Sequence, residues 1–156
     1  VTLSSPSSWS LVFNGTTSDD PVWAGLEKSS GEDGQILEAR LALLQGTGSS
    51  SVREEPLQRL HDDTHGDSLV FYALGTSSKL NNAKVLKKDH VAMDGIQVDQ
   101  TVISGTCEGR DAVVEIRDVP TDNGLFTLVS GYFTPCGEKT LQELDSIYEH
   151  VKIKKQ

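Results

Sequence analysis

The most regular pattern in the chain lies in its last third, in three consecutive segments of strand length, residues 96–102, 112–117 and 125–133. Apolar and polar positions alternate in the first two segments, and this two-residue period is typical of half-buried β-strands. Asp94-Gly95 precedes the first segment and residues 122–124 precede the third, and both stretches are rich in turn-forming residues. Because the connections are short, the three segments are predicted to form an antiparallel meander.

The last of these segments is apolar on both faces. Its large apolar residues are Leu125, Val129 and Phe133 on one face, and Phe126, Leu128 and Tyr132 on the other. A strand that is apolar on both faces requires cover on both sides. We therefore expect residues 125–133 to lie in the middle of the sheet.

An amphipathic helix is predicted after this strand. Thr134 is a good N-cap residue, and Pro135 suits the first helical position, where its missing N–H would be unpaired anyway. The apolar face comprises Leu141, Leu144, Ile147, Tyr148 and Val151. Helices of this length are marginal without packing, so we expect it to lie on the sheet. The alternative is a helix that is exposed to a partner.

The earlier part of the chain predicts further strands and one short helix. The expected strands are residues 8–13, 21–26, 36–44, 68–74 and 83–91. Helix is the alternative for residues 36–44, which have high helix propensity, and for residues 68–74, a continuous apolar run. Residues 52–61 predict a short helix, with Pro56 in its first turn. Residues 1–10 are serine-rich and predict a flexible tether, which leaves residues 11–156 as a single α+β domain.

The composition of the chain indicates a single domain and argues against some classes of binding partner. The chain has 156 residues, which suits one domain, and its hydrophobic content of 36% predicts long polar loops rather than a second core. A formal net charge of −9 argues against a nucleic-acid surface and against binding to anionic membranes by charge alone. No stretch is long and apolar enough to span a bilayer.

The start of the chain suggests processing. The sequence begins at Val1, and its only methionine is Met93. We therefore expect a mature form from which an upstream targeting segment was removed. Asn14-Gly15-Thr16 matches a glycosylation sequon, which matters only in a eukaryotic secretory pathway.

The two cysteines, Cys107 and Cys136, are predicted to form a disulfide. In a meander the first and third strands end at the same edge of the sheet, roughly 10 Å apart. A bridge needs Cα atoms roughly 4.4–6.8 Å apart, so the loops must curl inward. Such a bridge indicates an exported protein. The rival hypothesis is that Cys136, near a helix N-terminus, is a reactive thiol with a lowered pKa.

Two clusters of titratable residues have both a chemical and a structural interpretation. His61 and His65 would share a helical face and could grip a metal ion, with Asp62, Asp63 or Asp67 as a further ligand. Gly66 favours a solvated helix end instead. A basic group, consisting of Lys79, Lys84, Lys87 and Lys88, would attract an anionic partner, although a solvated face is the simpler interpretation. The sequence contains no nucleophile elbow, P-loop or dinucleotide fingerprint.

The order of elements resembles the Mog1/PsbP-like superfamily. The matching features are Pro6 to Trp9, the Val-Leu-Lys-Lys-Asp run of residues 85–89, Met93 to Ile96, and residues 125–129 followed by the closing helix. The resemblance implies an α/β/α sandwich around an antiparallel sheet, in mostly non-enzymatic proteins. These include photosystem assembly subunits, a nuclear transport factor, secretion chaperones and bacterial envelope lipoproteins. They share no functional residues, so none is carried over. The cysteine pair departs from the general pattern and points toward an exported branch.

Three functional hypotheses follow. The first is a non-enzymatic extracytoplasmic binding or accessory module without a cofactor, anchored by a lipid upstream of Val1 in the manner of a bacterial envelope lipoprotein. The second is a metal-dependent hydrolase that uses His61, His65 and the nearby aspartates. The third is a secretion chaperone that binds a hydrophobic helix of a client protein.

Overall fold

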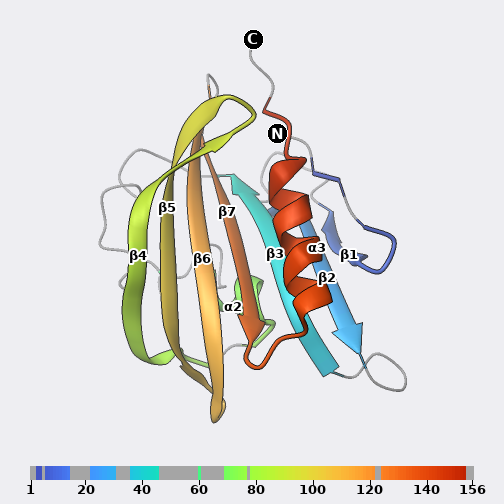
Figure 1. Ribbon diagram of the computed structural model, residues 1–156, viewed down its shortest axis with the longest axis vertical. Coiled ribbons are helices and arrows are strands. Elements are labelled where there is room, and N and C mark those ends of the chain that lie inside the picture. The colour runs from blue at the N-terminus through green and yellow to red at the C-terminus, as the bar shows by residue number, and fades with distance from the viewer. Residues whose placement is uncertain are drawn as a thin grey trace.

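The computed structural model describes residues 3–4, 6–14, 22–30, 36–45, 60, 69–76, 78–121 and 124–153. These residues form seven strands and two helices (Figure 1). In chain order the elements are β1 (Ser10–Asn14), β2 (Val22–Ser30), β3 (Ile36–Gln45), α2 (Leu69–Leu74), β4 (Asn81–Met93), β5 (Ile96–Cys107), β6 (Arg110–Thr121), β7 (Gly124–Phe133) and α3 (Glu138–Glu149). Neither helix of this described part is long and apolar enough to cross a membrane.

All seven strands belong to one antiparallel sheet, in the order β1-β2-β3-β7-β6-β5-β4. The last four strands of the chain form a meander, which confirms the pairing predicted from the alternating segments. Its first two hairpins turn at Asp94-Gly95 and Glu108-Gly109, and all four of these residues have positive φ, as tight hairpin turns require. β7 lies between β3 and β6, which confirms the predicted central position of the strand that is apolar on both faces.

The two faces of the sheet carry different helices. α3 crosses one face and α2 lies on the other (Figure 1). The core on the α2 face includes Val70, Leu74, Ile103, Val114 and Val129. The core on the α3 face includes Leu41, Val98, Leu128, Leu144 and Ile147. The apolar face predicted for the closing helix is confirmed, since Leu144, Ile147 and Tyr148 are buried.

The predicted α/β/α sandwich is wrong, because the described residues form largely β structure. α2 has six residues and α3 has twelve, and they pack on a single seven-stranded sheet. A sandwich needs helical layers as wide as the sheet. A helix about 10–12 Å across covers roughly two strands set about 4.8 Å apart. On its own face α3 therefore leaves much of the sheet uncovered, and β4 and β5 lie to its side (Figure 1).

The strand predicted for residues 68–74 is also wrong, since these residues form helix α2. The buried residues of this helix are Leu69, Val70, Tyr72, Ala73 and Leu74. A short helix that is buried on nearly every side has no polar face. Its sequence of apolar residues therefore cannot be distinguished from that of a buried strand. Gly75 follows with a φ of 74°, the left-handed conformation that commonly ends a helix.

Two other segments test the boundaries that the sequence predicted. β3 confirms the strand over the helical alternative for residues 36–44. The predicted start of the closing helix at Thr134-Pro135 is wrong, because α3 begins at Glu138 and Gly137 is its N-cap residue. The Thr134 amide instead donates a hydrogen bond to the Asp111 carbonyl, with a donor–acceptor distance of 2.8 Å. Thr134 therefore extends the pairing of β6 with β7 by one residue.

Some predictions fall mainly outside the described residues. The helix predicted for residues 52–61 is one of them, although Leu60 itself is buried in the core on the α2 face. The Asn14 side chain and the rest of its sequon are outside them as well.

The described residues before β1 contact the rest of the fold. Trp9 is buried in the core on the α3 face, and the Ser8 hydroxyl donates a hydrogen bond to Glu143 of α3. Lys28 forms an ion pair with the same carboxylate at 2.5 Å. Burial opposes ionisation of Glu143, but the bonds from Lys28 and Ser8 outweigh it and lower its pKa. The division of the chain at residue 10 into a tether and a domain stays a prediction.

Candidate functional site

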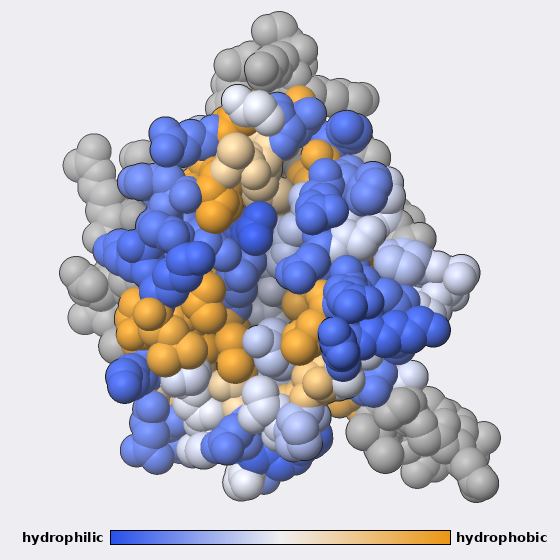
Figure 2. Space-filling model, in the orientation of Figure 1, coloured by the Kyte–Doolittle hydropathy of each residue, from blue (hydrophilic) through white to orange (hydrophobic). Residues whose placement is uncertain are grey.

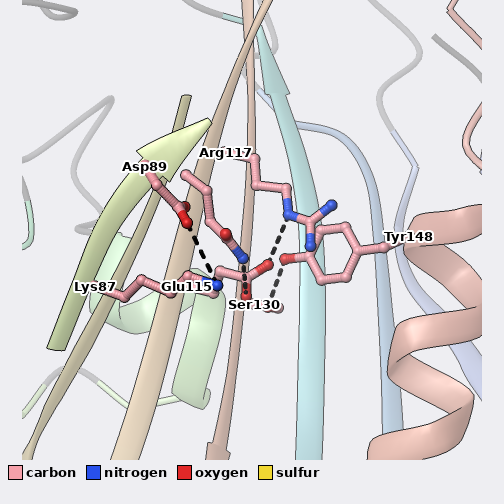
Figure 3. Close-up of polar contacts among 7 residues, drawn as sticks. Lys87, Asp89, Glu115, Arg117, Ser130 and Tyr148 are labelled. Carbon is pink, nitrogen blue, oxygen red and sulfur yellow. Dashed lines mark hydrogen bonds and ion pairs between the residues drawn. The ribbon is translucent and has the colours of Figure 1, made fainter. Parts of the chain in front are cut away.

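A band of polar side chains crosses the α3 face of the sheet where α3 leaves it open. The strand register places the band in two neighbouring rows, which are Asp89, Gln100 and Arg117 in one row, and Lys87, Glu115 and Ser130 in the other. The next row on the same face is apolar, with Val91, Val98 and Val119. The polar band, whose contacts are drawn in Figure 3, therefore adjoins an apolar row on the same face of the sheet.

Arg117 is the best-fixed cation of this band. Its Nε donates a hydrogen bond to Glu115 Oε2 at 2.8 Å, and its Cζ lies 3.9 Å from the centroid of the Tyr148 ring. Its side chain is only 14% exposed, so the charge is largely removed from water. The guanidinium is therefore held by a carboxylate at its edge and an aromatic ring at its face (Figure 3).

Tyr148 connects this arrangement to α3. Its hydroxyl donates a hydrogen bond to Ser130 Oγ at 2.5 Å. Burial raises the pKa of Tyr148, and the charge of Glu115 raises it further. The phenol therefore stays protonated at physiological pH and serves as a hydrogen-bond donor and a stacking platform.

Gln100 and Asp89 leave two acceptors without partners beside Arg117. The Gln100 amide donates a hydrogen bond from Nε2 to Glu115 Oε1 at 2.9 Å. Gln100 Oε1 and Asp89 Oδ1 are both buried and have no hydrogen-bond partner among the described residues. Asp89 is paired through its other oxygen, at 3.4 Å from Lys87 Nζ. These acceptors therefore lie on the two strands beside Arg117, in the same row of the sheet.

A cavity of about 260 Å³ opens between α3 and the sheet next to this band. It is lined by Val91, Ala92, Arg117, Asp145, Tyr148 and Glu149. In the space-filling view the surface is hollowed between α3 and the neighbouring strands, and hydrophobic and hydrophilic groups meet there (Figure 2). The cavity thus has an apolar wall from β4, an acidic wall from α3 and a guanidinium stacked on a ring.

The structure does not form the predicted disulfide, and both thiols are free. Cys107 is buried in the core on the α2 face. Cys136 precedes α3, and its electrostatic neighbours are Glu38 and Lys28. Glu38 accepts a hydrogen bond from Thr140 of α3, which places this group on the α3 side. The sheet therefore separates the two sulfur atoms, and an inward curl of the loops does not join them.

The rival prediction of a reactive Cys136 is wrong in direction. Burial raises the pKa of the Cys136 thiol, and the carboxylate of Glu38 adds to the increase, although Lys28 opposes it. Burial also raises the pKa of Cys107. Both side chains are therefore predominantly neutral thiols at neutral pH.

Thiol counting tests this arrangement. We expect two titratable thiols in protein that is unfolded without reductant, because neither cysteine has a disulfide partner. In the folded protein the reaction of both thiols should be slow, since burial keeps them protonated. Protein reduced before unfolding provides the control and should give the same count. A count that rises from zero to two only after reduction would contradict the structure.

The other predicted clusters contribute little to the site. His61, His65 and the aspartates between them lie outside the described residues, and within these residues no group of three or more His, Cys, Asp or Glu side chains is placed to hold a metal ion. All four lysines of the predicted basic group are exposed, and Lys84 and Lys87 lie on the same face of the sheet as the polar band. Of the predicted basic group, Lys87 alone has an ion pair with a member of the band.

Reasoning from the sequence missed Arg117, Tyr148 and Gln100 as a functional group. In the alternating pattern Glu115 and Arg117 lie on the strand face opposite Val114 and Ile116. The available signal is that Val113 and Val119 share this face. A charged pair between apolar positions on one strand face indicates a buried polar site rather than a solvated one.

Comparisons with known proteins leave the family open. No family model and no curated protein matches the chain. Among solved structures, the fold is similar to the crystal structure of LpqN, involved in cell envelope biogenesis of Mycobacterium tuberculosis. The identity is 16%, the TM-score is 0.49, and the match covers 96% of this chain and 80% of that chain. The Mog1/PsbP-like resemblance stays a prediction, and LpqN supplies no residue assignment.

Proposed function

We propose that the protein is a non-enzymatic extracytoplasmic module that binds a small ligand in the cavity between α3 and β4. The observation that carries the proposal is Arg117, which lines the cavity while Glu115 and Tyr148 fix its orientation. Neither η nitrogen has a hydrogen-bond partner among the described residues, and neither is fully buried. A guanidinium that is fixed in advance and has free donors loses little entropy when it binds a ligand.

The chemistry of the lining residues supports binding rather than catalysis. The titratable groups around the cavity are Arg117, Asp145, Tyr148 and Glu149. The Tyr148 hydroxyl is engaged with Ser130, and burial raises its pKa. Among these lining residues there is no serine, cysteine, histidine or lysine, so the lining lacks the pairing of such a nucleophile with a base that covalent catalysis commonly uses. The hydrolase and chaperone hypotheses stay predictions, and no contact described above favours either of them.

The proposed location outside the cytoplasm, with an upstream lipid anchor, rests on the sequence. The serine-rich composition of residues 1–10 is typical of a segment that joins an anchor to a domain, although Ser8 and Trp9 themselves pack against the fold. A single domain with a net charge of −9 is well suited to remain soluble at a surface. In this proposal the cavity faces a compartment in which small molecules of the envelope are available.

The test is ligand capture with a matched pair of variants. The protein is incubated with small molecules extracted from the envelope of its host, purified, and examined by native mass spectrometry. A retained molecule that is chemically unchanged after release is expected. Asp145→Trp should abolish retention by filling the cavity, while Gln142→Trp, on an exposed position of the same helix outside the cavity lining, should not.

Two results would contradict this proposal. If Asp145→Trp retains the same molecule as the unmodified protein, the cavity is not the binding site. If the molecule is released in altered form, the protein is an enzyme. The location is checked in the same host, because the protein should be accessible to an impermeant label in intact cells.

A further inference from the structure

We infer that the ligand of this cavity is a small zwitterion, that is, a molecule with one carboxylate and one ammonium group, such as a free α-amino acid. This inference rests on the proposed function and assigns the ligand class of the same site. It follows from the opposite charges that line one cavity of about 260 Å³.

Arg117 supplies the position for the carboxylate. Its Nε is occupied by Glu115, and one face of its guanidinium is covered by the Tyr148 ring. The η nitrogens remain as donors toward the cavity that Arg117 lines. The planar fork of a guanidinium matches the two oxygens of a carboxylate. Because the side chain is only 14% exposed, a ligand carboxylate would satisfy donors that water reaches poorly.

Asp145 and Glu149 supply the position for the ammonium. They are one turn apart on α3, and both line the cavity. Two like charges at this spacing repel each other, and the C-terminal half of a helix disfavours anions. The last turn of α3 contains no basic residue that would offset them. A cationic group of the ligand would remove both unfavourable interactions.

Two acceptors without partners among the described residues lie on the strands beside Arg117, outside the lining of the cavity. Gln100 is 6% exposed, and its unpaired Oε1 belongs to the residue paired with Arg117 on the neighbouring strand. The unpaired Oδ1 of Asp89 belongs to the residue paired with Gln100 on the other side. An acceptor-rich surrounding therefore adjoins the guanidinium. Together with Glu115 they surround the charge of Arg117 on the sheet side, while the ligand would contact the residues that line the cavity.

Size and shape restrict the ligand further. The β4 wall is formed by Val91 and Ala92, which offer contact to a short apolar group. A cavity of about 260 Å³ is smaller than the usual range for drug-sized ligands, roughly 300–1,000 Å³. A simple anion would be repelled by the acidic wall, and a simple cation would be repelled by Arg117. A small molecule with both charges avoids both penalties.

The experiment compares one zwitterion with its two halves. The ¹⁵N-labelled full chain is titrated with L-alanine, sodium acetate and ethylammonium chloride at equal ionic strength. L-alanine should shift the amide signals of Val91, Ala92, Asp145 and Glu149. Acetate and ethylammonium should each bind at least tenfold more weakly, a difference of about 1.4 kcal/mol. Equal affinity for all three probes, or no shift with L-alanine, would overturn the inference.

Variants identify the groups responsible. Asp145→Asn and Glu149→Gln should each weaken L-alanine binding and leave the weak binding of acetate unchanged or stronger. Glu138→Gln removes the same charge from the exposed first turn of α3 and should have no effect. Arg117→Lys should weaken both L-alanine and acetate, because the ammonium lacks the fork. Retention of an envelope molecule that is not a zwitterion would overturn this inference alone, whereas the loss of all cavity binding would overturn the proposed function as well.

Discussion

Gly131→Val is expected to destabilise the fold by about 3 kcal/mol or more, at the upper end of the range for overpacking. Gly131 lies on β7, where α2 packs most closely on the sheet. A Cβ atom at this position would lie 2.7 Å from the Ala73 carbonyl oxygen and 2.8 Å from Leu74 Cδ2. The carbonyl belongs to helix backbone, so it cannot move aside without displacing α2. Urea unfolding followed by circular dichroism measures the change in free energy of unfolding.

A second glycine provides the matched control. A Cβ atom at Gly137 would have Thr140 Oγ1 as its nearest neighbour, at 3.9 Å, and Gly137 has a φ of −60°. Gly137→Ala should therefore change the free energy of unfolding by less than about 1 kcal/mol. Gly131→Ala keeps the measurement accessible if the valine variant does not fold. Equal effects of Gly131→Ala and Gly137→Ala would mean that α2 is not seated on β7.

The sheet could be predicted from the sequence because its strands have a regular signal. The segments of β5 and β6 alternate with a period of two, and turn residues lie between the strands. The apolar residues on both faces of β7 also predicted its central position in the sheet. These signals are local, since each depends only on residues within one strand. Gly131 carries no such signal, because the reason for a glycine there is the backbone of α2, which is distant in the chain.

The layering of the molecule could not be predicted for a related reason. Residues 69–74 are apolar in every direction, so their pattern does not reveal whether they form a helix or a strand. Their helical form places α2 against β7, although the length of six residues is too small for a layer. The resemblance to a sandwich superfamily implied a helical layer on each face of the sheet. Residues 69–74 are too few to form such a layer.

The candidate site could not be predicted from the sequence because its residues are distant from one another along the chain. Arg117 on β6 meets Tyr148 on α3 and Gln100 on β5, and only the strand register and the position of α3 bring them together. For the cysteines the error was the reverse, because two residues that do not meet were predicted to be bonded to each other. Strand-end geometry placed Cys107 and Cys136 at one edge of the sheet, but it did not determine on which side of the sheet each thiol lies.

Leu144→Ala tests the packing of α3, which forms one wall of the cavity. Leu144 is 5% exposed and belongs to the same buried cluster as Leu41 and Leu128 of the sheet. Removing its methyl groups loses transfer free energy and leaves a void, so the expected cost is about 2–5 kcal/mol. In urea unfolding the midpoint should fall while the slope stays the same, because the folded state keeps its compactness.

The control for this change is on the exposed side of the same helix. Gln142→Ala removes a side chain that faces solvent and should change the free energy of unfolding by less than about 0.5 kcal/mol. If Leu144→Ala has an equally small effect, α3 is not packed on the sheet and is free to bind a partner. Tyr148 would then no longer be held over Arg117, and the cavity that carries the proposed function would lose its wall.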